Sequence, residues 1–366
     1  MNLEDKLIGK LHSAQEIDEE ELLIVLGASE DKIPEYKTKL DLLEAEFEVY
    51  MEANDIPYHD AKKLALGLRD FLWKDKKNRS TRDFLLPDVI DTELANKEEK
   101  VRHCVGSTAK YWVLGSRFGL KQSVLLSPSH IYSRVILDDK STRTLLDLEN
   151  TRASGKINFD NYFDTKEFGI EGLLVATLLN RADQKNKEGN FLGALDDYNQ
   201  AAKFEALKDE SFYNKAILKY THGYYEDALE DINKALELNY NWINNSNFHY
   251  NKGLILLELK KSEEALECFE KAIGINNQEF EESKKPNEFE ETNEKNIDCF
   301  VSIVRAKKQL KKFEEAIADY SWLMIIDEKN KPHYLMERGK LKTQAGLQDI
   351  DGAIKLNPKL ENIFLK

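Results

Sequence analysis

Four residues whose side chains could take part in one reaction occur in order along the chain. They are Cys104, His130 and the acids Asp147 and Glu149. Cys104 stands at the predicted start of an apolar helix, His130 starts a predicted strand, and the two acids close the next strand. A thiolate is a nucleophile, an imidazole can exchange its proton, and a carboxylate can orient the imidazole. This order predicts a catalytic site built from a cysteine, a histidine and an acid.

The expected position of Cys104, in the first turn of a helix, favours a reactive thiol. An ordinary thiol has a pKa of about 8.5, and both a helix N-terminus and a neighbouring imidazolium lower it. His130 would take up the thiol proton and later protonate a leaving amine. Backbone N–H groups around Cys104 would bind the oxyanion of an acyl intermediate.

The register of a predicted hairpin decides whether Asp147 or Glu149 faces the imidazole. The segments HIYSRVIL and TRTLLDLE flank the turn DDKS and predict two paired strands. If Asp138 pairs with Ser141 across a two-residue loop, His130 lies opposite Glu149, with Asp147 one step along the same face. A slip of one residue would turn these side chains to the other face.

The elements before the hairpin are expected to be helical. Residues 1 to about 100 carry apolar residues three and four apart, which predicts helices, and Pro87 fits near a helix start. Gly119 is a natural end for the helix that Cys104 begins. His103 adjoins the thiol, but neighbouring helix residues point in different directions, so we expect no catalytic role for it.

Three segments of this region resemble the transglutaminase-like thiol fold, which is related to papain in its order of cysteine, histidine and acid. They are HCVGSTAKYWVLGSRFGL, SPSHIYSRV and LLDLENT. The closest resemblance is to the bacterial SirB-type branch, whose P-x-H and E-x-T motifs are matched by the tripeptides that end at His130 and begin at Glu149. The resemblance covers roughly residues 35 to 160.

The resemblance implies an α+β papain-like or transglutaminase-like domain with an N-terminal helical bundle. It also implies that Glu149 is the third member of the site, with Asp147 as its rival. One departure of this chain from the branch, and one property of the branch itself, bear on activity. Arg102 stands two residues before Cys104 where glycine is usual, and many members of the branch have lost the cysteine.

The C-terminal half contains internal repeats. The segments NRADQKNKEGNFLGALDDYNQA, NKAILKYTHGYYEDALEDINKA and NKGLILLELKKSEEALECFEKA superimpose without gaps. Each has a small residue, a second one 12 residues later, a third 7 beyond, and a large residue three before the last. In the three copies, the first small position is Ala182, Ala216 and Gly253, and the second is Ala194, Ala228 and Ala265. The third is Ala201, Ala235 and Ala272, and the large residue is Tyr198, Ile232 and Phe269. The pattern resembles the tetratricopeptide repeat, whose period is about 34 residues.

Two further copies match less closely. A fourth places Ala316 12 residues after Val304. A fifth keeps Gly339, Ala353 and a terminal Leu-Asn-Pro, but it has lost about five residues at its turn.

The predicted organisation is therefore a first domain over residues 1–170 and an all-α solenoid of about five tetratricopeptide repeats over 171–366. Residues 278–296, between the third and fourth copies, are polar and acidic. They predict an insertion or an extended acidic loop.

Asn180, Asn214 and Asn251 recur two residues before the first small position, on the face that lines the concave groove in this family. They would either hydrogen-bond a peptide backbone or represent ordinary repeat consensus. The family's carboxylate clamp for chaperone C-termini requires Lys and Asn where this chain has Leu179 and Asp183. Binding of such tails is therefore not expected.

Composition limits the remaining possibilities. The net charge of −14 and the 33% of charged residues give no basic footprint for nucleic acid, and an acidic surface repels anionic lipid. No apolar run suits a membrane span or a signal peptide, and an odd count of three cysteines argues against a disulfide framework. We expect a cytoplasmic protein in which Cys268 and Cys299 are packing residues.

No histidine spacing suits a metal site, and the chain has no Walker A or GxGxxG motif, so no cofactor is expected. Two functions remain open. The first is a thiol hydrolase or acyltransferase that acts on amide or isopeptide bonds through an acyl-cysteine intermediate, while the repeats bind its protein substrate. The second is an adaptor whose repeats bind a protein or peptide and whose transglutaminase-like domain is degenerate.

Overall fold

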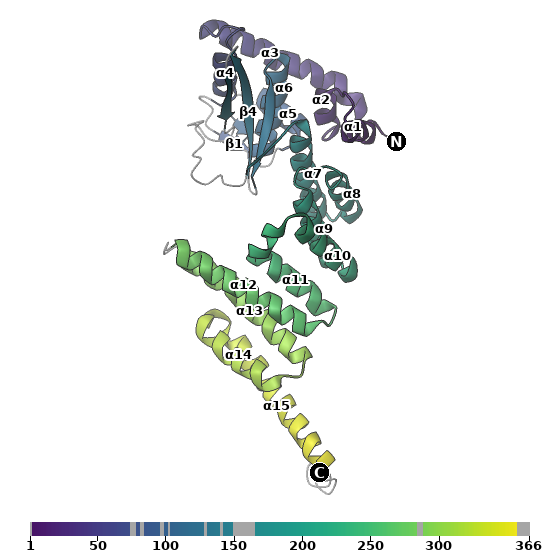
Figure 1. The fold of residues 1–366 in the computed structure, drawn as a ribbon, viewed down its shortest axis with the longest axis vertical. Coiled ribbons are helices and arrows are strands. Elements are labelled where there is room, and N and C mark those ends of the chain that lie inside the picture. Colours follow the sequence, from purple (N-terminus) through teal and green to yellow (C-terminus); the bar gives the residue numbers. More distant parts are fainter. Residues whose placement is uncertain are drawn as a thin grey trace. The chain divides into compact units, whose positions relative to one another are not determined.

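The fold is described here from a computed structural model, which describes residues 2–73, 78–80, 84–95, 99–101, 103–127, 130–139, 142–148, 165–283 and 288–356. The chain divides into two units, Met1–Ser211 and Phe212–Lys366, each described by itself (Figure 1). The division falls inside helix α9 (Lys208–Thr221) rather than at the predicted 170/171 boundary. The first predicted repeat therefore belongs to the first unit.

The N-terminal hundred residues are mainly helical, as predicted. Their helices are α1 (Leu3–His12), α2 (Glu19–Val25), the 3-10 turn η1 (Glu30–Lys32), α3 (Ile33–Ala53), α4 (Ala61–Trp73) and α5 (Leu86–Ala95). Pro87 is the second residue of α5, as predicted. Two three-residue strands, β1 (Asn78–Ser80) and β2 (Glu99–Val101), pair in parallel and are too short to give a sequence pattern.

The long helix α3 shows why this region is helical. Its buried residues Leu40, Leu43, Phe47 and Met51 recur every three or four positions, so they form one apolar stripe. The opposite face carries charged residues and remains exposed. This stripe anchors α3 to the core of the first unit.

Helix α6 (Cys104–Arg117) is the central element of the first unit and is buried from Val105 to Gly115. The Tyr111 hydroxyl donates a hydrogen bond to the Ala65 carbonyl of α4 at 3.0 Å. Gly119 follows the helix with a φ of 73°, a conformation that suits glycine, and so ends α6 as predicted.

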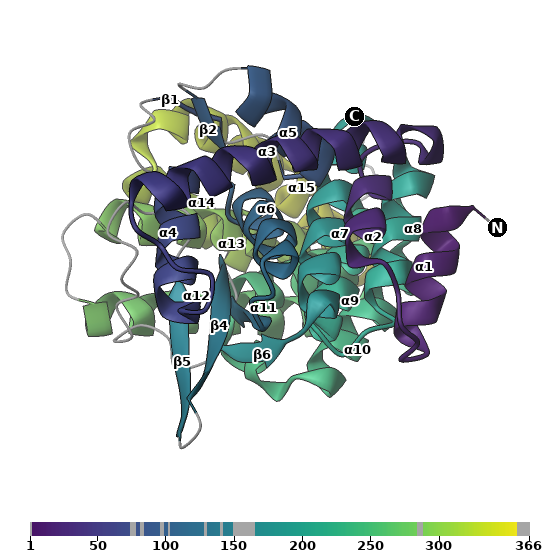
Figure 2. The ribbon, with the colours of Figure 1, turned by 90° about the horizontal axis from the view of Figure 1, so that it is seen from above.

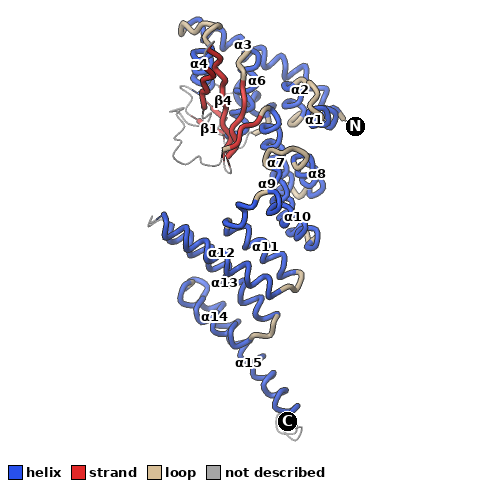
Figure 3. Tube along the Cα trace, viewed as in Figure 1, coloured by secondary structure: helices blue, strands red, loops and turns tan. Residues whose placement is uncertain are grey.

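Four antiparallel strands follow α6, in the order β5-β4-β3-β6. They are β3 (Gln122–Ser127), β4 (His130–Asp139), β5 (Thr142–Leu148) and β6 (Lys166–Phe168). Helix α6 packs against β4 and β3, and Figure 2 shows α6 near β4. Figure 3 shows these strands in red among the helices of the first unit. The predicted hairpin of β4 and β5 is confirmed, whereas β6 was not predicted.

The predicted register of the hairpin is wrong by two residues. The last pair before the turn is Asp139 with Thr142, and Arg134 lies opposite Asp147. A shift of two keeps every side chain on its face but changes its partner across the strands. The reason is electrostatic, because this register brings Asp147 beside the Arg134 guanidinium.

Antiparallel helices continue the chain after the sheet. In the first unit they are α7 (Ile170–Lys187) and α8 (Phe191–Ala201). The second unit contains most of α9, then α10 (Tyr225–Leu238), η3 (Tyr240–Asn244), α11 (Ser246–Glu258), α12 (Ser262–Ser283), α13 (Glu288–Gln309), α14 (Phe313–Ile326), η4 (Glu328–Asn330) and α15 (Lys331–Leu356). The pairs α7/α8, α9/α10, α11/α12 and α13/α14 are the first four predicted copies.

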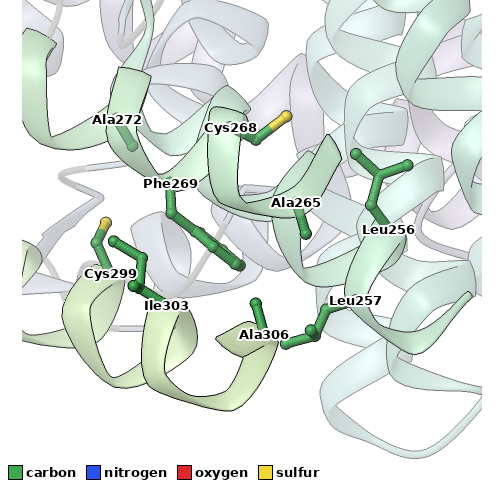
Figure 4. Close-up of a cluster of buried hydrophobic side chains, with 9 residues drawn as sticks. All are labelled: Leu256, Leu257, Ala265, Cys268, Phe269, Ala272, Cys299, Ile303 and Ala306. Atoms are coloured by element: carbon green, nitrogen blue, oxygen red, sulfur yellow. The ribbon is translucent and has the colours of Figure 1, made fainter. Parts of the chain in front are cut away.

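The small residues of the repeats have the predicted packing role. The alanines at these positions are fully buried. A Cβ atom added at Gly253 would lie 2.6 Å from the Phe269 ring, so only glycine permits this approach of α11 and α12. Figure 4 shows Phe269 in the middle of the resulting apolar cluster, which also contains Cys268 and Cys299.

The structure contradicts the loop alternative for residues 278–296 and the helix pair expected for the fifth copy. Residues 278–296 are not one extended loop, because α12 reaches Ser283 and α13 starts at Glu288. Glutamate-rich sequence favours helix, and the buried side chains of Asn276 and Asn296 hydrogen-bond at 2.9 Å across the two extensions. The fifth copy is not a helix pair either, since α15 is one continuous helix.

Candidate functional site

Cys104 is the first residue of α6, and its side chain is partly exposed. His103 is the N-cap residue, with an extended backbone at φ −70° and ψ 126°. Its carbonyl accepts the first helical hydrogen bond from the Ser107 N–H at 2.9 Å. The predicted placement of the thiol in the first turn of a helix is therefore confirmed, where the N-terminal dipole favours a thiolate.

His103 lies in a more structured environment than the sequence suggested. Its ring packs 5.6 Å from the Phe84 ring, and it hydrogen-bonds the Asn180 side chain. Burial lowers the pKa of His103, and the nearby charge of His130 lowers it further, while the Asn180 bond opposes both effects. Its Nδ1 atom is buried without a hydrogen-bond partner among the described residues. The structure thus places His103 at the start of the thiol helix, within electrostatic range of His130.

His130 begins β4, opposite Ser127 of β3. Its ring lies 4.8 Å from the Tyr132 ring, and α6 packs against β4. The helix, strand and hairpin predicted to carry the site are therefore adjacent.

Asp147 does not face the imidazole in the way that the predicted register required. Its two carboxylate oxygens accept hydrogen bonds from Arg134, at 2.5 Å from Nε and 2.8 Å from Nη2. Arg134 also pairs with Glu167 at 2.8 Å, and these carboxylates raise its pKa. Glu149, the other predicted acid, lies outside the described residues. The identity of the third member therefore stays a prediction.

The three asparagines predicted to line a peptide groove differ in their surroundings. In the first unit, Asn180 donates a hydrogen bond to the Ala176 carbonyl at 2.7 Å and reaches His103. In the second unit, Asn251 donates to the Tyr213 hydroxyl at 2.7 Å. The Asn214 side chain is partly exposed and forms no hydrogen bond with the described residues. Asn214 and Asn251 therefore fit a groove better than Asn180 does.

In the second unit, the first helices of successive repeats are joined by bonds between their side chains. Glu258 of α11 pairs with Arg305 of α13 at 2.5 Å, and Glu337 of α15 pairs with Lys308 of α13 at 3.5 Å. The Tyr213–Asn251 bond joins α9 to α11 in the same way. These helices therefore form one face, which we call the inner face. Val301 lies one helical turn before Arg305 and Met336 adjoins Glu337, and both are exposed beside these bonds.

A second spacing, this time of charged residues, recurs between the repeats and was not predicted from the sequence. A cation three residues after the first small position pairs with an aspartate three residues after the second. The pairs are Lys185–Asp197 at 2.8 Å, Lys219–Asp231 at 2.7 Å and Lys307–Asp319 at 2.7 Å. The superimposed segments contain this pattern, because the charged residues recur at a fixed distance after the small residues.

The third repeat replaces this ion pair with apolar side chains. Leu256 and Cys268 occupy the two positions, and both belong to the buried cluster of α11, α12 and α13. Lys252 instead donates a hydrogen bond to the Asn233 side chain at 2.8 Å. Burial raises the pKa of Cys268 and raises that of Cys299 to about 12, which fits their predicted packing roles.

No cluster of three or more His, Cys, Asp or Glu side chains suited to a metal ion occurs among the described residues. In the same part of the chain, none of the helices combines the length and the apolar character needed to cross a bilayer.

Comparison with known proteins agrees with the repeat pattern. Residues 246–278, which include α11 and much of α12, match the family model of the tetratricopeptide repeat, so the chain contains this repeat. The TPR repeat-containing protein MJ1428 of Methanocaldococcus jannaschii is 34% identical over 94 residues, 26% of this chain and 16% of that protein. The tetratricopeptide repeat protein 36 homolog of Nematostella vectensis is 34% identical over 95 residues, 26% of this chain and 44% of that protein. The chain thus matches less than half of either relative.

One solved structure resembles most of the chain. Menin, in the crystal structure that reveals its binding site for Mixed Lineage Leukemia (MLL) protein, superimposes with a TM-score of 0.55. The similarity covers 87% of this chain and 78% of menin, at 12% sequence identity. At that identity the similarity concerns the fold alone.

Proposed function

We propose that this protein is an adaptor that binds a peptide segment of a protein partner on the inner face of its second unit. The observation that carries the proposal is the partly exposed Asn214 amide, which forms no hydrogen bond with the described residues. In the next repeat, the Asn251 amide donates a hydrogen bond to the Tyr213 hydroxyl and is held in place by it. An extended peptide has one donor and one acceptor per residue, and side-chain amides at repeat spacing can pair with them.

The surroundings of these asparagines suit a peptide with apolar side chains. Tyr213 stacks on Trp242 with 4.6 Å between ring centroids, and Val301 and Met336 are exposed on the same face. Apolar contacts supply affinity, while the amides fix the direction of the backbone. The binding of MLL protein by menin supports the choice of a protein as partner, because menin has a similar fold.

Selection of a phage-displayed random peptide library on the full chain tests the proposal. The affinity of an enriched peptide is then measured by fluorescence anisotropy. Each lost hydrogen bond costs about 1 kcal/mol, so the double variant Asn214→Ala/Asn251→Ala should weaken binding by a factor of about 10 to 30. Asn241→Ala, at an exposed site in η3, is the control and should bind normally. Equal affinity of the double variant and the control would contradict the proposal.

A second candidate function rests on the surroundings of Cys104. The partly exposed thiol begins α6, His103 is the N-cap residue of that helix, and α6 packs against β4, which begins at His130. We propose, as the resemblance implies, a transglutaminase-like site in which the thiolate attacks an amide carbonyl. His130 would protonate the leaving amine, and water or another amine would then accept the acyl group. Glu149 remains the proposed orienting acid, since Asp147 is held by Arg134.

The pH dependence of Cys104 alkylation tests this second candidate. An activated thiol should react with iodoacetamide with an apparent pKa at least about 1 unit below the ordinary 8.5. His130→Ala should move that value back toward 8.5, whereas His222→Ala, on a solvent-facing histidine of the second unit, should leave it unchanged. A wild-type value near 8.5 that does not respond to His130→Ala would contradict thiol catalysis.

A further inference from the structure

The last helix of the array departs from the plan of the repeats before it. In each of the four preceding copies, the residue seven after the first small position has a positive φ and makes the turn between the two helices. These residues are Gly189, Gly223, Lys260 and Lys311. In the fifth copy, Gly346 stands seven residues after Gly339, yet it lies inside the continuous helix α15. The turn is absent.

The sequence beyond Gly346 nevertheless keeps the signature of a second repeat helix. Gly346, Ile350 and Ala353 have the small, large, small order with spacings of four and three residues. The same spacing separates Ala228, Ile232 and Ala235 in the second repeat. Because 7 rather than 12 residues separate Gly339 from Gly346, the copy has lost its turn and kept its packing residues.

The first half of α15 lacks the cover that a second helix provides. A Cβ atom added at Gly339 would meet no atom within 4 Å, whereas at the equivalent Gly253 it would meet the Phe269 ring at 2.6 Å. Leu335 is 46% exposed, although the equivalent Leu178 and His249 are 0% and 6% exposed. Among the described residues, no helix occupies the position of a second helix beside Gly339. We call this uncovered surface the Gly339 face.

We propose that the Gly339 face is covered by residues 346–356 of a second copy of this chain, in a reciprocal exchange. Without a turn, the second half of α15 cannot fold back onto the first half of its own helix. A second copy offers the same segment, with the small and large residues that suit the Gly339 face. Each chain would then complete the fifth repeat of the other, which gives a closed two-fold dimer.

Figure 1 agrees with this geometry, because the yellow end of α15 continues beyond α14 toward the C-terminus. Sedimentation equilibrium of the full chain tests the proposal. The wild type should be a dimer at about 100 µM chain concentration. Insertion of five residues after Ala345, the first of them glycine, restores the turn length and places a glycine seven residues after Gly339, so the second half can cover its own Gly339 face. This variant should be monomeric with unchanged helical circular dichroism.

A matched pair of glycine substitutions tests the surface itself. A Cβ atom at either Gly339 or Gly274 meets nothing within 4 Å, so both sites accept a larger residue within the single chain. Gly339→Leu should raise the dimer dissociation constant at least tenfold because it blocks the close approach of the exchanged helix, and Gly274→Leu should not change it. A monomeric wild type, a dimer that survives the insertion, or equal effects of the two substitutions would each overturn the proposal.

Discussion

At Arg134 one guanidinium holds two carboxylates, Asp147 of β5 and Glu167 of β6, so a single residue ties together strands that are distant in sequence. Its bidentate pairing with Asp147 selects the register of the hairpin. Apolar alternation alone cannot do this, because a shift of two residues keeps the same face buried. The sequence therefore predicted the hairpin but not the partners of its acids.

The Arg134–Asp147 pair gives a prediction for stability. Asp147 is 8% exposed, so Asp147→Asn leaves a poorly solvated guanidinium and should lower the free energy of unfolding by about 2 kcal/mol. Glu167→Gln, at a more exposed carboxylate, should cost less than about 1 kcal/mol. Urea unfolding of the two variants checks the order. A larger loss for Glu167→Gln would show that this account of the register is wrong.

His249 makes the second unit sensitive to acid. Its Nε2–H donates to the Ile243 carbonyl at 2.8 Å, its Nδ1 is buried without a partner among the described residues, and burial lowers its pKa. The folded chain therefore favours the neutral ring, while the unfolded chain binds a proton below about pH 6.5. The free energy of unfolding should fall as pH decreases below 6.5, by at most about 1.4 kcal/mol per unit for this residue.

His249→Gln keeps a donor for Ile243 and cannot titrate in this range, so it should flatten the acid slope. Urea unfolding at pH 7.5, 6.5 and 5.5 provides the measurement. His222→Gln, at an exposed histidine, is the matched control and should keep the wild-type slope. An unchanged slope in His249→Gln would rule out the role given to this ring.

At the scale of elements, the repeats were predictable because two helices can pack closely only where small residues recur at fixed spacing. The same segments place a cation and an aspartate at fixed offsets, and these pair within three repeats. The shape of α15 was not predictable, because its sequence keeps packing residues while losing the turn. Likewise, the acidic residues 278–296 carry no apolar pattern, so their helical extensions depend on glutamate propensity and the Asn276–Asn296 contact.

The ion pairs within the repeats should stabilise the array unequally. Asp231 is 5% exposed and pairs with Lys215 at 3.0 Å and with Lys219 at 2.7 Å. Asp231→Asn removes a buried carboxylate that pairs with two cations and should lower the free energy of unfolding by about 3 kcal/mol. Glu237→Gln breaks the exposed pair with Lys234 and should change it by less than about 0.5 kcal/mol. Thermal unfolding of both variants measures the two losses of stability. Similar losses would contradict the unequal contribution of the buried and exposed ion pairs.

At the scale of the whole molecule, the three cysteines should report their environments. Cys104 is partly exposed, whereas Cys268 and Cys299 are buried in the cluster of Figure 4 and their pKa values are raised by burial. Ellman's reagent should therefore label one thiol rapidly in the native chain and three in urea. Cys104→Ser should remove the rapid reaction. Two or three rapid thiols in the native chain would contradict the burial described here.

The sequence predicted the architecture of the second unit more completely than that of the first. Matches to the tetratricopeptide repeat model and to repeat-containing relatives support what the sequence pattern indicated for the second half of the chain. The transglutaminase-like assignment of the first half remains a proposal, because short motifs fix the order of chemical groups but not their distances. Helix α6, strand β4 and the hairpin are present as predicted. The lowered pKa of His103 and its interaction with Asn180 could not be predicted from its position in the sequence.

The measurement that tests the adaptor function most directly is hydrogen exchange of the full chain with and without a peptide enriched from the phage library. Binding on the inner face should slow exchange in α9, α11 and α13, because a ligand that bridges these helices suppresses their local opening. Slowed exchange confined to residues 104–148, or to α10, α12 and α14, would show that the peptide binds elsewhere and would contradict the proposed function.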